Sequence, residues 1–259
     1  MRNFVGTPPK HPGADRAMEP WSDASTGARI FRLGYISALE VTGFYMAMIT
    51  ARAALTALRE GNRRFVGKLG LESESGLEAG AARARRRELP GGQEPLAIVL
   101  GCSDARVPAE IVFDQGLGDL FVIRVAGNIV APSQIGSVEF AAAAFGTRLV
   151  VVLGHSNCGA VHATLEQLVR PSREQSRNLR SIVDRIRPAV EGLLERGQPG
   201  DRQTLEQQAV RANIRMSANH LRHGSELLEQ LIQNDGLLVV GAEYSLETGV
   251  VDFFDGVPP

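Results

Sequence analysis

The sequence predicts an α/β fold with a mostly parallel central sheet, about four parallel strands plus an antiparallel edge strand, flanked by helices and preceded by an N-terminal helical arm. Three apolar runs have the length of buried strands, and they lie at residues 96–101, 119–125 and 148–153. Helix-like segments separate these runs, and such alternation is typical of a parallel sheet that is covered on both faces. Two further strands are expected at 237–243 and 249–254, joined by a turn at Glu247-Thr248-Gly249.

The pattern divides the chain into an N-terminal extension and one α/β domain. Residues 1–47 are expected to be a flexible or helical extension, because their first part holds Pro, Gly, Asp and Ser with little periodicity and helical character begins only near Ile30. Residues 48–259 are expected to form a single domain. Its first helix is predicted from Ala51 to Phe65, with Gly61-Asn62 as a place where it could break.

Helices are expected to connect the strands. The pattern predicts a turn and a short helix within 102–114, and longer helices at 133–145 and 158–169. The polar and amphipathic region 174–234 is expected to hold two or three helices. Crossovers between parallel strands should be right-handed, and sites in such sheets form beyond the carboxyl ends of the strands, where the strand order reverses.

Composition argues against several classes of protein. A net charge of −1 and a pI near 6.5 give no reason to expect nucleic acid or an acidic membrane as a partner. No run approaches the ~20 apolar residues of a membrane span, and residues 7–20 lack the apolar core of a signal peptide. Two cysteines in 259 residues indicate a reducing compartment, so a cytoplasmic location is expected. The arginines at 83 and 85–87 are interpreted as a solvated helix face.

Each cysteine lies in a turn that follows an apolar run. Cys102 follows the first run, and Cys158 follows the third in the segment Gly154-His155-Ser156-Asn157-Cys158-Gly159. If these two strands are parallel neighbours, both thiols and the imidazole of His155 meet at one edge of the sheet. Two thiolates and an imidazole are a zinc-binding set that leaves a fourth position open, as in a catalytic site. A disulfide between Cys102 and Cys158 is the alternative.

Asp104 and Arg106 follow Cys102 in the same turn. The carboxylate could ligate zinc directly, or Arg106 could hold it off the metal so that it accepts a hydrogen bond from zinc-bound water. A salt bridge that only stabilises the turn is the structural alternative. Because two thiolates neutralise the charge of zinc, the metal is expected to be a weaker Lewis acid than one held by three histidines. Activity is therefore expected to rise into mildly alkaline pH.

Two motifs, Cys102-Ser103-Asp104-Ala105-Arg106 and His155-Ser156-Asn157-Cys158-Gly159, resemble those of the β-class carbonic anhydrases. The similarity extends to Glu60-Gly61-Asn62-Arg63-Arg64-Phe65, Asp114-Gln115-Gly116-Leu117-Gly118-Asp119 and Phe121-Val122-Ile123-Arg124-Val125-Ala126-Gly127-Asn128. The resemblance implies a zinc enzyme with one Zn²⁺ per chain, which reversibly hydrates carbon dioxide to bicarbonate and a proton by zinc-bound hydroxide.

The resemblance also implies roles for individual residues. Cys102, His155 and Cys158 would be the metal ligands, and Asp104 and Arg106 the catalytic dyad. Asp104 would orient the zinc-bound hydroxide in an open state and replace it as fourth ligand in a closed state. The family further implies a homodimer or a dimer of dimers, in which the N-terminal helix contacts the partner.

The chain departs from the family pattern at two positions. Ala105 replaces the usual Ser, with little expected effect because the ligand and dyad positions are intact. Members with a second, inhibitory bicarbonate site have a Trp where this chain has Val99, which argues against that site although Arg124 and Tyr244 match its other residues. Gln115 is a candidate for the Gln that some members place near the substrate.

Two other functions remain open at this point. Hydrolases of carbonyl sulfide or carbon disulfide resemble this family and keep its ligands, so the motifs do not separate them from a hydratase. A non-catalytic zinc or thiol sensor is the alternative outside enzymes, and the intact Asp104 and Arg106 argue against it. His162 is interpreted as a partly exposed helix histidine.

Overall fold

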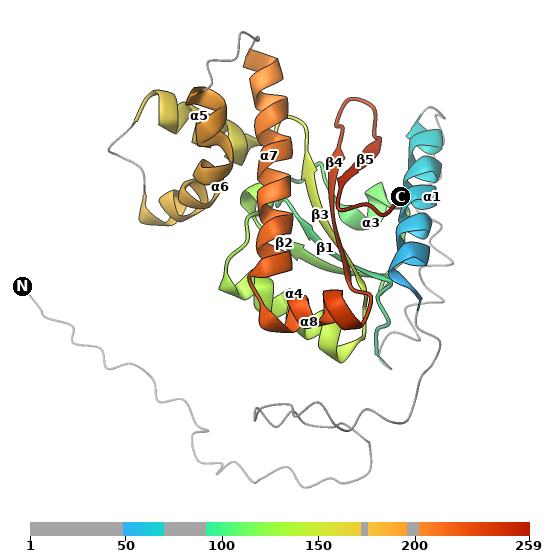
Figure 1. Cartoon of the computed structure of the whole chain (residues 1–259). Coiled ribbons are helices and arrows are strands. Elements are labelled where there is room, and N and C mark those ends of the chain that lie inside the picture. Colours follow the sequence, from blue (N-terminus) through green and yellow to red (C-terminus); the bar gives the residue numbers. More distant parts are fainter. Residues whose placement is uncertain (1–48, 70–91, 172–175, 196–201) are drawn as a thin grey trace, which may run out of the picture. The chain divides into compact units, whose positions relative to one another are not determined.

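A five-stranded sheet forms the centre of the computed structural model (Figure 1). The structure describes residues 49–69, 92–171, 176–195 and 202–259. All of them belong to the second of two units into which the chain divides, residues 1–44 and 45–259. The expected extension at 1–47 and the arginines at 83 and 85–87 lie outside the described residues. Among the described residues, the helices and strands follow one another in the predicted order.

The strand order is β2-β1-β3-β4-β5. The strands are β1 (Ala97–Gly101), β2 (Leu120–Arg124), β3 (Leu149–His155), β4 (Leu238–Tyr244) and β5 (Val251–Asp255). The first four are parallel, and β5 pairs with β4 in the antiparallel sense at the edge. The predicted fold class is therefore confirmed. The chain leaves β1 toward β2 on one side and reaches β3 on the other, so the order reverses between β1 and β3.

Helices cover both faces of the sheet. Helix α1 (Ala51–Leu69) and the short α3 (Ala109–Val112) pack on one face. The other face is covered by α4 (Pro132–Ala144), α5 (Gly159–Val169), α6 (Arg177–Glu195), α7 (Arg202–His223) and α8 (Glu226–Asn234). A short 3₁₀ turn, η2 (Ala126–Asn128), follows β2. No helix within the described ranges is long and apolar enough to cross a bilayer.

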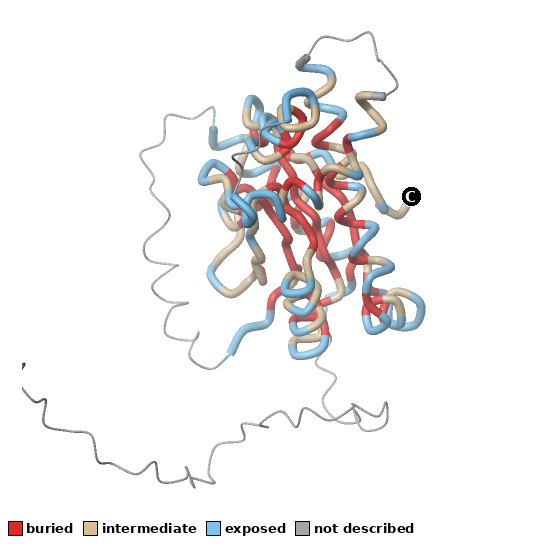
Figure 2. The backbone as a smooth tube through the Cα atoms, turned by 90° about the vertical axis from the view of Figure 1, so that its left-hand side faces the viewer, coloured by how far each residue is buried: buried red, intermediate tan, exposed pale blue. Residues whose placement is uncertain are grey.

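Burial on both faces explains the continuous apolar runs of the central strands. Along β1, Ile98 and Leu100 point to the core under α4–α8, whereas Ala97 and Val99 point to the core under α1 and α3. Every residue of β1 and of β3 is buried, and Figure 2 shows the buried backbone concentrated in the sheet. Complete burial of a Val, Leu or Ile side chain stabilises the fold by about 1.5–3 kcal/mol. Strands β1 and β3 therefore form a rigid base for the turns that follow them.

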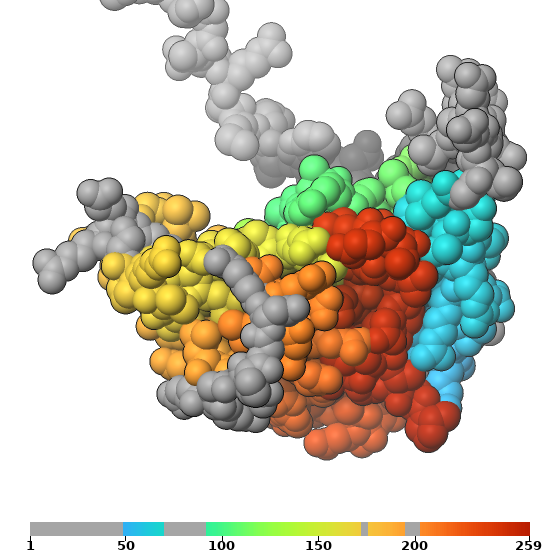
Figure 3. All heavy atoms as spheres, turned by 90° about the horizontal axis from the view of Figure 1, so that it is seen from above, coloured from blue at the N-terminus to red at the C-terminus, as the bar shows by residue number. Residues whose placement is uncertain are grey.

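Helix α1 approaches α3 closely and lies beside the β4–β5 hairpin. A side chain at Gly61 would overlap the carbonyl oxygen of Phe113, so only glycine permits this approach. The buried side chain of Asn62 donates to the carbonyls of Val112 and Gly249 at 3.1 and 2.9 Å and accepts from the N–H of Val251 at 2.9 Å. The break allowed at Gly61-Asn62 was wrong, because both residues face neighbouring backbone within a continuous helix. Figure 3 shows α1 and the C-terminal strands side by side on the surface.

Candidate metal centre

The two cysteine turns meet where the strand order reverses. Cys102 directly follows β1, His155 is the last residue of β3, and Cys158 directly precedes α5. Strands β1 and β3 are hydrogen-bonded neighbours, with Gly101 opposite Leu153. The carboxyl ends of the two strands therefore bring the three side chains to one edge of the sheet, as the apolar runs predicted.

The three side chains form a buried trio of metal-ligand type. The Sγ atoms of Cys102 and Cys158 and a ring nitrogen of His155 lie within 4.8 Å of one another, and each residue is at most 5% exposed. In a tetrahedral zinc site such donors lie about 3.5–3.8 Å apart, so a small contraction around an ion would satisfy the trio. Both cysteines are free thiols, which removes the disulfide alternative.

The tautomer of His155 supports metal binding. Its Nδ1 lies 2.8 Å from the carbonyl oxygen of Ser156, and because a carbonyl only accepts, Nδ1 must carry the proton. Nε2 then presents a lone pair, and this buried atom has no hydrogen-bond partner in the described part of the chain. An unpaired buried nitrogen is costly. A metal ion between the two sulfurs would pair it, so the residues present fit Zn²⁺.

The thiols titrate as a pair. The pKa of Cys102 is lowered, chiefly by a hydrogen bond from the thiol of Cys158, and also by the N–H of Gly127, which lies 3.3 Å from its Sγ. The pKa of Cys158 is raised, because its thiol donates a hydrogen bond to the sulfur of Cys102 and because it is buried. The position of Cys158 at the start of α5 would by itself lower its pKa, and this effect is outweighed here. N–H groups at the helix start act in that direction, but the neighbouring thiolate acts against them more strongly.

Asp104 and Arg106 form a bidentate ion pair beside the trio. Arg106 donates from its backbone N at 3.0 Å and from Nε at 2.9 Å to Oδ1 of Asp104, and from Nη2 at 2.7 Å to Oδ2. These hydrogen bonds hold the pKa of Asp104 well below its usual range. Oδ2 also lies 3.9 Å from Nε2 of His155, so the carboxylate faces the trio without belonging to it.

Comparison with known proteins agrees with this geometry. A family model described as carbonic anhydrase matches residues 97–251. The carbonic anhydrase of Mycolicibacterium smegmatis is 40% identical over 200 residues, which are 77% of this chain and 91% of that protein. The chain belongs to the β-class carbonic anhydrase family.

Solved structures of this family have the same fold. The β-carbonic anhydrase CafA of Aspergillus fumigatus matches with a TM-score of 0.62 at 24% identity, over 79% of this chain and 92% of that one. A tetrameric β-carbonic anhydrase of Sordaria macrospora matches with a TM-score of 0.60 at 23% identity, over 69% and 94% of the two chains.

Two residues that support this β-carbonic anhydrase site were not assigned that role from the sequence. Arg124, at the end of β2, donates to the carbonyls of Cys102 at 3.0 Å and of Asp104 at 2.5 Å, so it holds the turn that carries both. Gly127 donates its N–H to Cys102 and has a φ of 69°, in the left-handed region that favours glycine. Both lie within a segment that the family resemblance includes, but their contacts depend on the pairing of β1 with β2.

The other candidates are not among the three metal-ligand side chains, although Tyr244 is the register partner of His155 in the sheet. Val99 is completely buried in the sheet, and Tyr244 is buried at the end of β4. The side chain of Gln115 donates to the carbonyl of Phe113 at 2.8 Å. His162, on the second turn of α5, lies 3.0 Å from a carboxylate oxygen of Glu206 and is 47% exposed, as a helix surface histidine should be.

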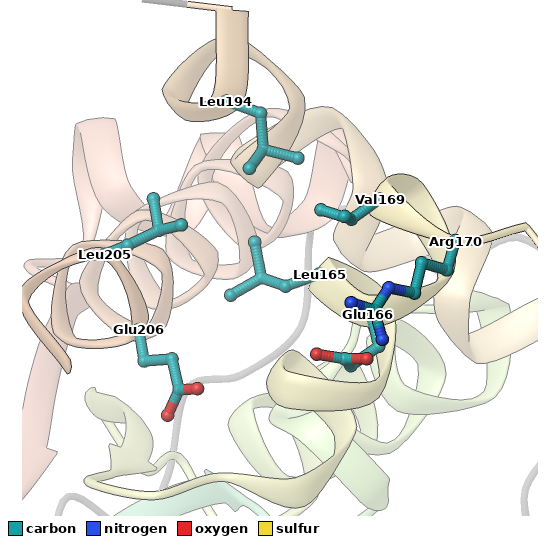
Figure 4. A pocket seen from close by; sticks show the side chains of 7 residues that line it. All are labelled: Leu165, Glu166, Val169, Arg170, Leu194, Leu205 and Glu206. Atoms are coloured by element: carbon teal, nitrogen blue, oxygen red, sulfur yellow. The ribbon is translucent and has the colours of Figure 1, made fainter. Parts of the chain in front are cut away.

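The described residues also line two cavities away from the trio. One, of about 150 Å³, lies between α5, α6 and α7 at the end of α5 that is remote from Cys158. Figure 4 shows the aliphatic side chains of Leu165, Leu194 and Leu205 pointing into it. The other, of about 370 Å³, is polar and lies beside the β4–β5 turn, where Ser156 and Glu247 line it.

Proposed function

We propose that this chain binds one Zn²⁺ through Cys102, His155 and Cys158 and reversibly hydrates carbon dioxide to bicarbonate and a proton. The observation that carries the proposal is the unpaired Nε2 of His155 between two buried thiols, with the Asp104–Arg106 pair beside it. When bound, zinc would supply a Lewis acid that lowers the pKa of a water at its open position.

The hydrogen bonds of Asp104 define what it would do there. An ionised carboxylate has about four acceptor positions, two on each oxygen. Oδ1 accepts twice from Arg106, whereas Oδ2 accepts only once and keeps one acceptor position open among the described residues. Oδ2 is also the oxygen that faces His155. Asp104 would therefore accept the hydrogen of the attacking O–H group and leave the lone pair of that oxygen directed at carbon dioxide.

Arg106 would keep Asp104 in this state. Its bidentate contact fixes the plane of the carboxylate and lowers its pKa, which favours the ionised form that only accepts hydrogen bonds. It also holds the carboxylate away from the fourth ligand position, which corresponds to the open state expected for the family. Rotation of Asp104 onto the metal would require these bonds to break.

We further propose that residues 48–259 form the enzyme's single domain and that the protein is a homodimer or a dimer of dimers in the cytoplasm. The tetrameric relative from Sordaria macrospora supports the assembly. The free thiols of Cys102 and Cys158 support a reducing compartment. Light scattering of the purified protein tests the assembly, and a monomer would contradict it.

Stopped-flow hydration of carbon dioxide, with zinc content measured on the same sample, tests the proposed reaction. We expect about one zinc per chain and fast hydration that increases from pH 7 to 8.5. Cys158→Ala should lose both zinc and activity, whereas Asp104→Asn should keep zinc and lose most of the activity. A wild-type protein that holds zinc but hydrates no carbon dioxide at either pH would contradict the proposal and direct the search to carbonyl sulfide.

A further inference from the structure

One carboxylate holds both residues that separate His155 from Cys158. Glu247 lies in the turn between β4 and β5. Its Oε2 accepts from the hydroxyl of Ser156 at 2.8 Å, and its Oε1 accepts from the side-chain amide of Asn157 at 2.8 Å. Hydrogen bonds to an ionised acceptor are roughly twice as strong as neutral ones, and the exposed carboxylate of Glu247 uses one oxygen for each of the two residues.

Ser156 connects this hold directly to the imidazole. The carbonyl oxygen of Ser156 is the partner of Nδ1 of His155, at 2.8 Å. The backbone N–H of Ser156 donates to the backbone carbonyl of Tyr244 at 3.0 Å. The hydroxyl of Ser156 accepts from the backbone N–H of Leu246 at 2.9 Å. A shift of Ser156 would therefore rotate the ring and move Nε2 away from the two sulfurs.

Asn157 connects the same hold to the second cysteine. Its φ is 55°, in the left-handed region that residues other than glycine seldom adopt. The hydrogen bond from its side-chain amide to Glu247 fixes the side chain of Asn157 while the backbone turns into α5 at Cys158. Glu247 thus acts on the residues next to both ligands and contacts neither of them.

The turn that carries Glu247 is itself anchored. Asn62 on α1 pairs with the carbonyl of Gly249 and the N–H of Val251, both at 2.9 Å. Ser245 also donates to Oε2 of Glu247 at 3.0 Å. The exposed turn that carries the carboxylate is therefore tied at both ends to the rest of the fold.

We propose that Glu247 is a positioning residue of the metal centre, which sets the geometry of His155 and Cys158 through Ser156 and Asn157. The inference rests on the zinc site of the proposed function. It predicts that zinc is held more weakly, and with altered coordination, when the carboxylate is removed, although the three ligands remain.

Competition with a chromophoric chelator measures the zinc dissociation constant in the purified full-length protein. We expect Glu247→Ala to raise this constant by about tenfold, the lower end of the effect of residues that orient metal ligands. Glu247→Gln, which keeps one acceptor oxygen, should have a smaller effect. With Co²⁺ in place of zinc, the thiolate-to-cobalt absorption bands should shift in Glu247→Ala.

Asp255→Asn is the matched control. Asp255 is also a carboxylate of the hairpin, paired with Arg222 at 2.7 Å, but it lies at the opposite end of β5 from the turn. Its loss should change the zinc dissociation constant by less than about twofold and leave the cobalt spectrum unchanged. An equal effect of the two substitutions would show general destabilisation and overturn the proposal.

A double-mutant cycle tests the route. In a protein with Ser156→Ala and Asn157→Gly, Glu247→Ala should weaken zinc binding by less than about twofold further. A full additional tenfold loss in that background would refute the role of these two residues. If the wild type itself binds no zinc, the proposed function fails. If the wild type binds zinc and Glu247→Ala and Glu247→Gln bind it equally well with unchanged cobalt spectra, only the role of Glu247 fails.

Discussion

Gly127→Ala should destabilise the protein and weaken its metal centre together. Gly127 has a φ of 69°, which costs a residue with a Cβ about 1–2 kcal/mol. The added Cβ would lie 2.8 Å from Cδ1 of Ile186 and 3.0 Å from Cβ of Ala160, so the Ile186 side chain and the start of α5 would have to shift. Overpacking of this kind typically costs about 1–3 kcal/mol. The sum is a loss of about 2–5 kcal/mol in the free energy of unfolding.

The same substitution disturbs a ligand, because the N–H of Gly127 lies 3.3 Å from Sγ of Cys102. Urea unfolding of the metal-free protein, followed by circular dichroism, measures the first effect, and chelator competition measures the second. Gly136→Ala is the control, since Gly136 is within α4 and has open space where its Cβ would lie. It should stabilise the protein by up to about 1 kcal/mol. A Gly127→Ala protein that unfolds at the wild-type urea concentration would refute the reasoning.

Three further predictions follow from the hydrogen bonds around the site. Asn62→Ala leaves two buried carbonyls and one N–H without their partner, and should lower the free energy of unfolding by about 3 kcal/mol; a loss below about 1 kcal/mol in urea unfolding would contradict this. Arg106→Ala should keep zinc but lower kcat/KM for hydration by about 10- to 100-fold, because Asp104 loses its two side-chain contacts; unchanged kinetics would show that the pair only stabilises the turn. The hydration rate should rise from pH 6.5 to 8.5, and this rise cannot come from Asp104, whose pKa is lowered in the folded protein. The stabilisation from a carboxylate with a lowered pKa is present above its unfolded pKa of about 4 and is lost only as pH falls further. A hydration rate that is flat from pH 6.5 to 8.5 would refute the argument that two thiolates make a bound zinc a weaker Lewis acid.

Much of the fold was predictable because the central strands are buried on both faces. Residues 96–101 and 148–153 are continuous apolar runs for that reason, and each ends in a turn with a cysteine. Their adjacency in a parallel sheet then brings the ligand trio together without further information. The pairing of Asp104 with Arg106 was also predictable, since the two residues are close in sequence.

The supporting contacts were not predictable in the same way. Asn62 was predicted as a place where the helix could break. Its role was hidden because its three partners are distant in sequence, at the end of α3, in the β4–β5 turn and at the start of β5. Glu247 was interpreted only as part of a turn, although it bonds two residues that precede Cys158. Gly127 has a required conformation that becomes visible only when η2 is packed against Cys102. Such roles depend on long-range neighbours, which one sequence does not reveal.

The position of the three donors would give a bound metal a second effect, as a removable cross-link. Cys102 comes from one strand end and His155 and Cys158 from another, and β2 and α4 lie in the chain between them. An ion bound by all three would close that part of the chain into a ring, and an unfolded chain must lose entropy to form such a ring. Metal affinity would then appear as folding stability. Because β2, α4 and β3 lie within the ring and α1 and β5 lie outside it, loss of the ion would act first on the segment between Cys102 and Cys158.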